Sequence, residues 1–209
     1  MSIITEHLGV VLAGLQLTLL LTLIGIIGAF LLGTAVGSTY ATEDFFLRKV
    51  AGTYIDVMRN IPIVVKLFFL YFVLGMDAFP AAIVALVTHQ SGFIADVVAA
   101  GFRSIPREQT EGARASGLSP RQVFGYVLFP QAMRVVMPPL TSQFIELAKN
   151  TSVVMLIGMQ DLTYVSENIQ TETFRYLQSF VMVTALYMLI MLTISAAMSL
   201  VSRRMAAYG

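Results

Sequence analysis

The sequence predicts an all-α membrane protein, in which about five transmembrane helices form one domain over residues 1–209. Hydrophobic residues make up 57% of the chain and charged residues 12%, whereas soluble domains carry about 25% charged residues. The mean hydropathy is +0.80. A helix that spans a membrane needs about 20 residues, and the apolar runs of this chain approach that length. In lipid, a helix satisfies the hydrogen bonds of its own backbone. This composition excludes a soluble fold, a disordered chain, a collagen-like rod and a nucleic-acid-binding domain.

The first predicted span covers residues 8 to about 36, a stretch without a charged residue. It is too long and too rich in glycine for a cleaved signal peptide, so we expect the chain to retain it. The second span covers about 61–74 and is lengthened at its start by residues 52–60. Pro62 should kink or start this helix, because proline lacks the N–H and clashes with the preceding turn.

The later segments follow in this order: a turn at 75–77, a third span at about 79–102, a polar stretch at about 103–131, a fourth span at about 135–157, a polar external connection at about 159–177 and a fifth span at about 179–201. Charged residues interrupt three of the spans. Lys66 lies in the second span, Asp96 in the third, and Glu146 and Lys149 in the fourth. These residues require an explanation, because charge inside a bilayer is costly.

Lys and Arg residues gather on one side of the predicted bundle, and cytoplasmic loops are the ones that carry such an excess. With five spans, one side holds Arg48, Lys49, Arg59, Arg103, Arg107, Arg114, Arg121, Arg134, Arg203 and Arg204. The opposite side holds only Arg175. We therefore expect the N-terminus outside, the C-terminus and the 103–131 loop in the cytoplasm, and a location in a bacterial inner membrane.

The 103–131 loop is predicted to form two short helices joined by a tight glycine turn. Ser104 can cap the first helix, and Gly117 suits a left-handed stop at its end. The spacing of Ser119 and Gln122 is that of a capping box. A break is expected at Pro130. The pattern alone fits a capped surface loop as well as a docking element.

This loop resembles the EAA loop of ABC importer permeases, in which Glu-Ala-Ala is followed after three residues by Gly and after nine more by Ile-x-Leu-Pro. The residues that carry the resemblance are Glu111, Gly112, Ala113, Gly117, Val127, Leu128, Phe129 and Pro130. Gly112, Val127 and Phe129 depart from the family's Ala, Ile and Leu. The resemblance implies that the loop, including Arg114, inserts into a groove of a cytoplasmic ATPase and passes its motion to the spans.

Most of the chain resembles the permeases of polar amino acid importers, of the histidine, glutamate, glutamine and arginine type. The motifs include a second-span motif with Arg59, Asn60 and Pro62, then Ala95-Asp96, Pro138-Pro139-Leu140, Lys149-Asn150-Thr151-Ser152 and Thr173-Phe174-Arg175. Three positions differ from the expected pattern, with Lys66 in place of Gln, Asp96 in place of Glu and Ala99 in place of Arg. These departures bear on the choice of cargo.

The resemblance implies an importer assembled from separate parts in the lipid bilayer. Two permease subunits, identical or paralogous, form the path. A dimer of cytoplasmic ABC ATPases hydrolyses ATP with Mg²⁺, and an extracytoplasmic binding protein delivers a polar amino acid such as glutamate, aspartate or glutamine. The sequence has no G-x-x-x-x-G-K-[ST] phosphate loop, so the ATPase must be another chain. This chain is then a transport subunit, not an enzyme, and binds no cofactor.

Polar residues within the spans are candidates for the substrate path, namely Lys66, Asp96, Glu146, Lys149, Asn150, Thr151 and Ser152. Glu146 and Lys149 are three residues apart, so they share a helix face and can pair. One interpretation places the pair on the path, where an amino acid needs one acceptor and one donor. The other makes it an internal ion pair, with the neighbouring polar residues as contacts between helices. Asp96 either pairs with Lys66 or lies near the cytoplasmic exit.

Other functions are less well supported by the residues. A membrane-embedded enzyme would need a catalytic pair, and His89 beside Ser91 shows neither an oriented base nor an oxyanion hole. His7 and His89 have no metal-ligand spacing, and the absence of cysteine excludes thiolate sites and disulfides. A channel-like or structural subunit would leave the capped loop unexplained. An ABC permease for another small solute is the remaining alternative.

Overall fold

The computed structural model describes residues 3–207, and every regular element in that range is helical, as predicted. The elements are α1 (Ile3–Glu6), α2 (Leu8–Tyr40), α3 (Phe45–Asn60), α4 (Ile63–Phe68), the π-helix η1 (Phe69–Val73), α5 (Ala78–Arg103), α6 (Arg107–Ala115), α7 (Pro120–Gln122), the π-helix η2 (Val123–Leu128), α8 (Phe129–Asn150), the 3₁₀-helix η3 (Thr151–Ile157), α9 (Leu162–Thr173) and α10 (Tyr176–Ala207).

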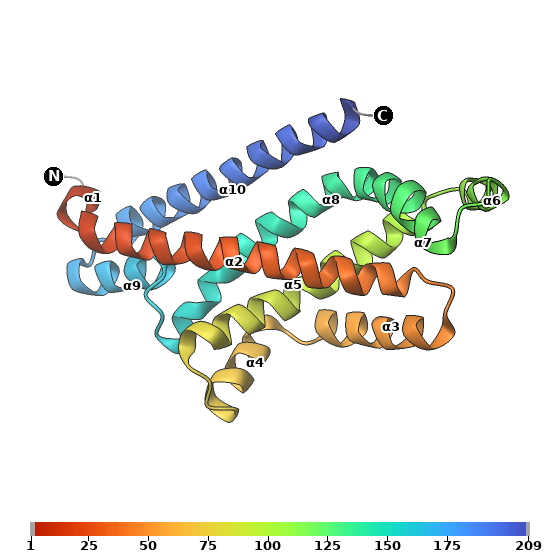
Figure 1. Ribbon diagram of the computed structural model, residues 1–209. Helices are drawn as coiled ribbons and strands as arrows, with labels where there is room; N and C mark the ends of the chain where they lie inside the picture. Colours follow the sequence, from red (N-terminus) through yellow and green to blue (C-terminus); the bar gives the residue numbers. More distant parts are fainter. Residues whose placement is uncertain (1–2, 208–209) are drawn as a thin grey trace.

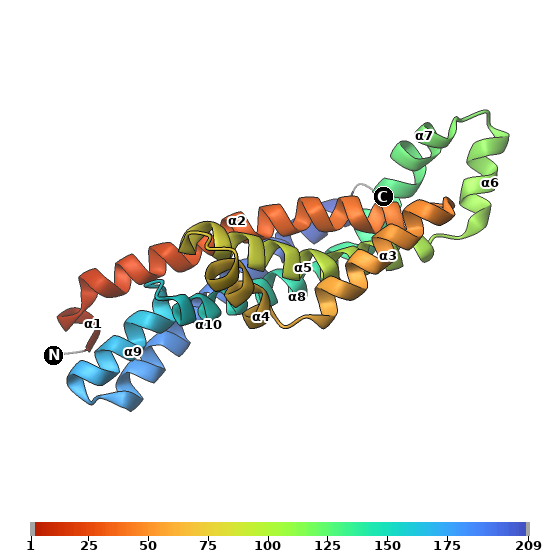
Figure 2. The ribbon, with the colours of Figure 1, turned by 90° about the horizontal axis from the view of Figure 1, so that it is seen from below.

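The long helices lie alongside one another in an elongated bundle (Figure 1). The loop helices α6 and α7 project from one end, which is also the end of the C-terminus. The N-terminus and α9 lie at the opposite end, as a view turned by 90° confirms (Figure 2). The two ends of the chain therefore lie at opposite ends of the bundle.

Within residues 3–207, three helices are long and apolar enough to cross a membrane, namely α2, α5 and α10. They correspond to the first, third and fifth predicted spans. The second predicted span is divided among α3, α4 and η1, so no single helix covers it. The fourth corresponds to α8 and η3, where charged side chains lower the hydropathy of α8. The fold is thus a helical membrane bundle in which two of the five expected spans are not simple hydrophobic helices.

The break between α3 and α4 occurs at Ile61 and Pro62, as the sequence predicts. Ile61 has an extended backbone, with φ −89° and ψ 122°, and Pro62 is the N-cap of α4. A residue before proline is driven out of the helical region by a clash with the proline ring, which ends α3 here. Within α3, the side-chain amide of Asn60 donates to the Asp56 carbonyl at 2.7 Å. The second-span motif therefore builds a corner between two helices.

Helices α2 and α5 pack closely because α2 presents small residues at four-residue spacing. A Cβ added to Gly37 would lie 2.5 Å from the Ala95 carbonyl oxygen, and one added to Gly33 would lie 2.7 Å from the Cβ of Ile94. Small residues let helix backbones approach in a membrane, where the hydrophobic effect does not drive their association. These glycines therefore fix the distance between the two spans.

One buried apolar cluster lies where α2, α5 and α8 meet. Ile94, Val98, Leu140 and Leu147 are almost fully buried there. Helix α10 packs against α8 and α9, yet only 11% of its most apolar window is buried within the chain. Most of the α10 surface is therefore available to lipid or to another membrane subunit.

Candidate functional site

The loop between α5 and α8 folds into the two short helices that the sequence predicts. Helix α6 ends at Gly117, which has φ +84° and donates its N–H to the Arg114 carbonyl at 3.0 Å. The N–H of Leu118 donates to the Ala113 carbonyl at 3.3 Å. These two bonds form a Schellman motif, which satisfies the last carbonyls of the helix. The predicted left-handed stop at Gly117 is confirmed.

Helix α7 begins with the predicted capping box. The Ser119 N–H donates to Gln122 Oε1 at 2.9 Å, and the Gln122 N–H donates to Ser119 Oγ at 3.4 Å. The break expected at Pro130 is wrong, because η2 leads directly into α8 and Pro130 is the second residue of α8. Ser104 does not cap α6, since it ends α5 and its hydroxyl donates to the Gly101 carbonyl at 2.7 Å.

Helix α6 has no buried residue, and it projects from the bundle (Figure 2). Glu111 and Gly112 are exposed, and Ala113 is partly exposed. A Cβ added to Gly112 would meet nothing within 4 Å. The Arg114 guanidinium lies 3.6 Å from the Glu43 carboxylate, which ties α6 to the connection between α2 and α3. The rest of the predicted coupling surface is free to contact a second protein.

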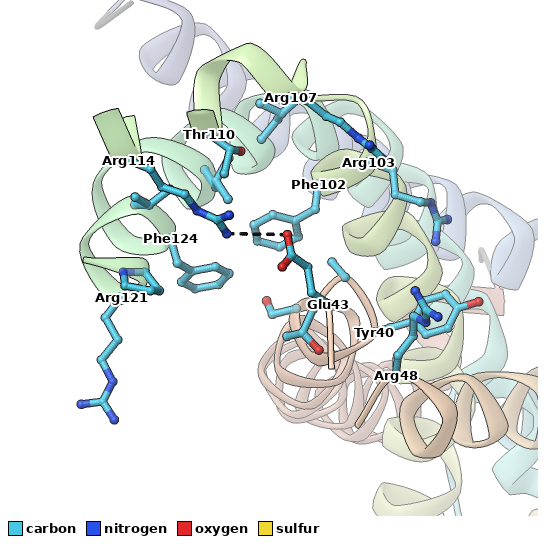
Figure 3. Close-up of a pocket in the computed structure, with 17 residues that line it drawn as sticks. Tyr40, Glu43, Arg48, Phe102, Arg103, Arg107, Thr110, Arg114, Arg121 and Phe124 are labelled. Atoms are coloured by element: carbon cyan, nitrogen blue, oxygen red, sulfur yellow. Dashed lines mark ion pairs between the residues drawn. The ribbon is translucent and has the colours of Figure 1, made fainter. Parts of the chain in front are cut away.

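A cavity of about 1090 Å³ separates the loop helices from the ends of α2 and α5. Its lining includes the Glu43–Arg114 ion pair, drawn as a dashed line in Figure 3. Five arginines line it, namely Arg48, Arg103, Arg107, Arg114 and Arg121. The rings of Phe102 and Phe124 stack beside them, with centroids 5.3 Å apart and planes at 19°. The loop thus encloses a strongly basic space at one end of the bundle.

Lys66 lies in α4 with only 9% of its surface exposed. Its ammonium group donates to the Met58 carbonyl at the end of α3 and lies 3.2 Å from Nδ1 of His89 on α5. A buried charge is tolerated when its hydrogen bonds are satisfied, and these partners supply that condition. Lys66 therefore joins α3, α4 and α5 at the corner formed by Pro62.

Asp96 pairs with Arg59, and not with Lys66. Arg59 Nη1 is 2.7 Å from Asp96 Oδ2, and Arg103 Nη2 lies 4.0 Å from Oδ1 of the same carboxylate. Gly92 allows this approach, because a Cβ at that position would lie only 2.9 Å from a side-chain carbon at the end of α3. The pair therefore fastens the end of α3 to α5, on the side of the α6 and α7 loop.

Glu146 and Lys149 form the predicted pair on α8, with Lys149 Nζ 3.4 Å from Glu146 Oε2. Their side chains are 54% and 51% exposed, so the pair is not part of this chain's core. Asn150 and Ser152 are partly buried. Thr151 is fully buried, and its hydroxyl donates to a carbonyl within the last turn of α8 at 2.8 Å. Thr151 therefore does not share the exposed surface of the ion pair.

Two contacts between spans involve residues that the sequence analysis did not select for this role. Gln90 on α5 donates through Nε2 to Gln143 Oε1 on α8 at 2.7 Å, and His89 contacts Lys66 as described above. Polar residues in the middle of an apolar run are the signal that could have identified them, because such residues bond across helices in a membrane.

The family described as binding-protein-dependent transport system inner membrane component matches residues 29–207 of this chain. The probable glutamine ABC transporter permease protein GlnM of Bacillus subtilis (strain 168) is 31% identical, over 98% of this chain and 97% of its own length. The glutamine transport system permease protein GlnP of Escherichia coli (strain K12) is also 31% identical, over 98% and 96%. The glutamate/aspartate import permease protein GltJ of the same strain is 29% identical, over 98% and 91%.

The fold is similar to those of solved transporters. A chain from a crystal structure of an amino acid ABC transporter with histidines has a TM-score of 0.85 and 30% identity, with 96% of each chain covered. A chain of the MetNI methionine ABC transporter, in an inward-facing conformation, has a TM-score of 0.83 and 23% identity, which supports the fold alone. The family match, the full-length relatives and the shared fold agree: this chain belongs to the binding-protein-dependent transport system inner membrane components.

Proposed function

We propose that this chain is the permease subunit of an ATP-driven importer for a polar amino acid. The observation that carries the proposal is α6, an exposed helix with a fixed stop at Gly117 and an open surface at Glu111 and Gly112. In this proposal α6 docks on a separate ATPase. Its motion reaches the membrane through α5 and α8, the two helices to which the loop is attached.

The proposal includes partners that this chain cannot replace. ATP and Mg²⁺ belong to a dimer of cytoplasmic ATPase subunits, since the sequence has no phosphate-binding loop. A second permease chain completes the path, and an extracytoplasmic binding protein supplies the amino acid.

We infer that the cargo is glutamine, glutamate or aspartate, because the relatives are named for glutamine and for glutamate and aspartate. Glu146 and Lys149 are the path residues best placed for this cargo, since their ion pair lies on the exposed side of α8. A zwitterionic amino acid needs an acceptor for its ammonium and a donor for its carboxylate, and this pair offers both. Lys66 and Asp96 instead hold α3 and α4 against α5.

Reconstituted transport tests this function. The chain is expressed with the ATPase and the binding protein encoded beside it, and the assembled transporter is placed in liposomes. We expect ATP-dependent accumulation of at least one of radiolabelled glutamine, glutamate and aspartate, with ATP hydrolysis stimulated by the loaded binding protein. Active ATPase without accumulation of any of the three would reject the proposed cargo, and flux without ATP would favour a channel-like subunit.

We also propose an N-terminus outside the cell and a C-terminus in the cytoplasm. The distribution of Lys and Arg supports this orientation, and the termini lie at opposite ends of the bundle (Figure 1). Reporter fusions at residue 115 and at the C-terminus are expected to be active in the cytoplasm, and a fusion at residue 168 outside it. A fusion at residue 115 that is active outside would reject the orientation.

A further inference from the structure

The cavity between the loop helices and the spans is lined by more arginines than acidic residues. Its five arginines come from four separate segments, with Arg48 on α3, Arg103 at the end of α5, Arg107 and Arg114 on α6, and Arg121 on α7. Among the lining residues that the structure describes, Glu43 is the one carboxylate. Placing so many like charges around one space is unfavourable unless an anion enters it.

Only part of this charge is paired within residues 3–207. Arg114 lies 3.6 Å from Glu43, and Arg103 lies 4.0 Å from Asp96. Three of the arginines form no ion pair in that part of the chain, namely Arg48, Arg107 and Arg121. In Figure 3, the Arg121 guanidinium points away from the ion pair, whereas Arg48, Arg103 and Arg107 lie on the other side of the cavity. Arg48 and Arg107 are therefore the unpaired donors that lie on the same side of the cavity.

The cavity lies where two membrane spans end. Tyr40 is the last residue of α2 and Arg103 the last of α5, and the Arg103 guanidinium lies 5.5 Å from the centre of the Tyr40 ring. Phe45 and Phe46, at the start of α3, are 70% and 71% exposed. The ends of two spans therefore form one wall of the cavity, and the loop helices α6 and α7 form the other.

We propose that this cavity binds the phosphate group of an anionic phospholipid. The guanidinium fork of arginine matches phosphate oxygens, and basic pockets between the ends of spans are suited to anionic headgroups. The stacked Phe102 and Phe124 rings provide an apolar wall for the glycerol part. A lipid bound here joins α3, α5 and α6. The lipid site uses Arg107 and Arg114 of α6, whereas the proposed ATPase contact uses Glu111 and Gly112 of the same helix.

Lipid retention by the purified transporter tests the proposal. Native mass spectrometry would measure phosphatidylglycerol and phosphatidylcholine bound after transfer from lipid nanodiscs that contain both in equal amounts. We expect selective retention of phosphatidylglycerol, weakened about fivefold for each arginine neutralised in an Arg48→Gln, Arg107→Gln double variant. The matched control is the Arg203→Gln, Arg204→Gln double variant, which removes the same charge at the exposed end of α10.

Three results would overturn the proposal. Equal retention of the two lipids by the unchanged protein would show that no selective site exists. An equal loss of bound phosphatidylglycerol in the cavity variant and in the control variant would show that only the net charge of the protein matters. Inorganic phosphate that protects the protein from heat in pure phosphatidylcholine nanodiscs, as strongly as phosphatidylglycerol does, would assign the site to a soluble anion. The same thermal measurement identifies any variant that retains little lipid because it is unfolded. Uptake assays are separate, so failure here leaves the transport proposal intact.

Discussion

Replacing Gly117 by aspartate is expected to abolish coupled uptake while the protein still reaches the membrane. Aspartate tolerates the left-handed backbone better than most residues, so the end of α6 persists. A Cβ added at Gly117 meets nothing within 4 Å in this chain, so we expect the added side chain to act on a docked partner. Disrupting a central contact of an interface weakens binding by about 2 kcal/mol or more, which is about 30-fold. Uptake and ATP hydrolysis stimulated by the binding protein measure the effect in proteoliposomes.

Glu111→Ala is expected to uncouple transport in the same way, because it removes an exposed carboxylate from the same helix. Gly125→Asp is the matched control. Gly125 is also exposed, and a Cβ added there would meet nothing within 4 Å, but it lies in η2 and its φ is not positive. Normal coupling in both loop variants, or an equal loss in Gly125→Asp, would remove the docking role from the tip of α6.

Removing the Glu146–Lys149 pair is expected to give a stable protein that no longer transports. Both side chains are about half exposed on the single chain, and ion pairs in such positions contribute only about 0–1 kcal/mol to stability. A single substitution instead leaves one lone charge, which costs about 3–5 kcal/mol where the assembled transporter excludes water. Thermal stability and uptake are measured for Glu146→Gln, for Lys149→Met and for the double variant. The expected pattern is stability restored in the double variant without uptake.

A double variant with the same chemical changes elsewhere provides the control. Lys49→Met with Glu167→Gln also removes one charge of each sign, from exposed positions on α3 and α9. It should keep both stability and uptake. If the Glu146→Gln, Lys149→Met protein transports normally, the pair is scaffold and the amino acid finds its partners on other side chains.

Features of the loop could be predicted from the sequence because each depends on a few neighbouring residues. The hydrogen bonds that end α6 at Gly117 reach back only a few residues along the chain. The capping box of Ser119 and Gln122 joins residues three positions apart. Long apolar runs likewise determine α2, α5 and α10, since a run of that length in lipid has few alternatives to a helix. The break expected at Pro130 is wrong because the π-helix η2 runs directly into α8, a continuation that the local sequence does not reveal.

The partners of the charged residues could not be predicted, because they depend on how distant segments pack. Asp96 bonds to Arg59 across 37 positions, and Lys66 reaches His89 across 23. To predict whether Asp96 pairs with Arg59 or with Lys66, one must know the direction of the chain after Pro62. The proline alone does not determine that direction. The close approach at Gly92 is the missing information, and it becomes visible only when α3 and α5 are placed together.

The corner at Pro62 restricts which side chains position 66 accepts. A helix that ends among apolar neighbours leaves carbonyl groups without donors, and such groups are costly where water is excluded. Lys66 supplies the donor that the backbone lacks at Met58, so its structural task is to terminate α3. Glutamine, the residue expected here from the resemblance, also ends in an N–H group. Glutamine at position 66 would therefore offer an N–H donor without the charge, on a side chain that is one atom shorter.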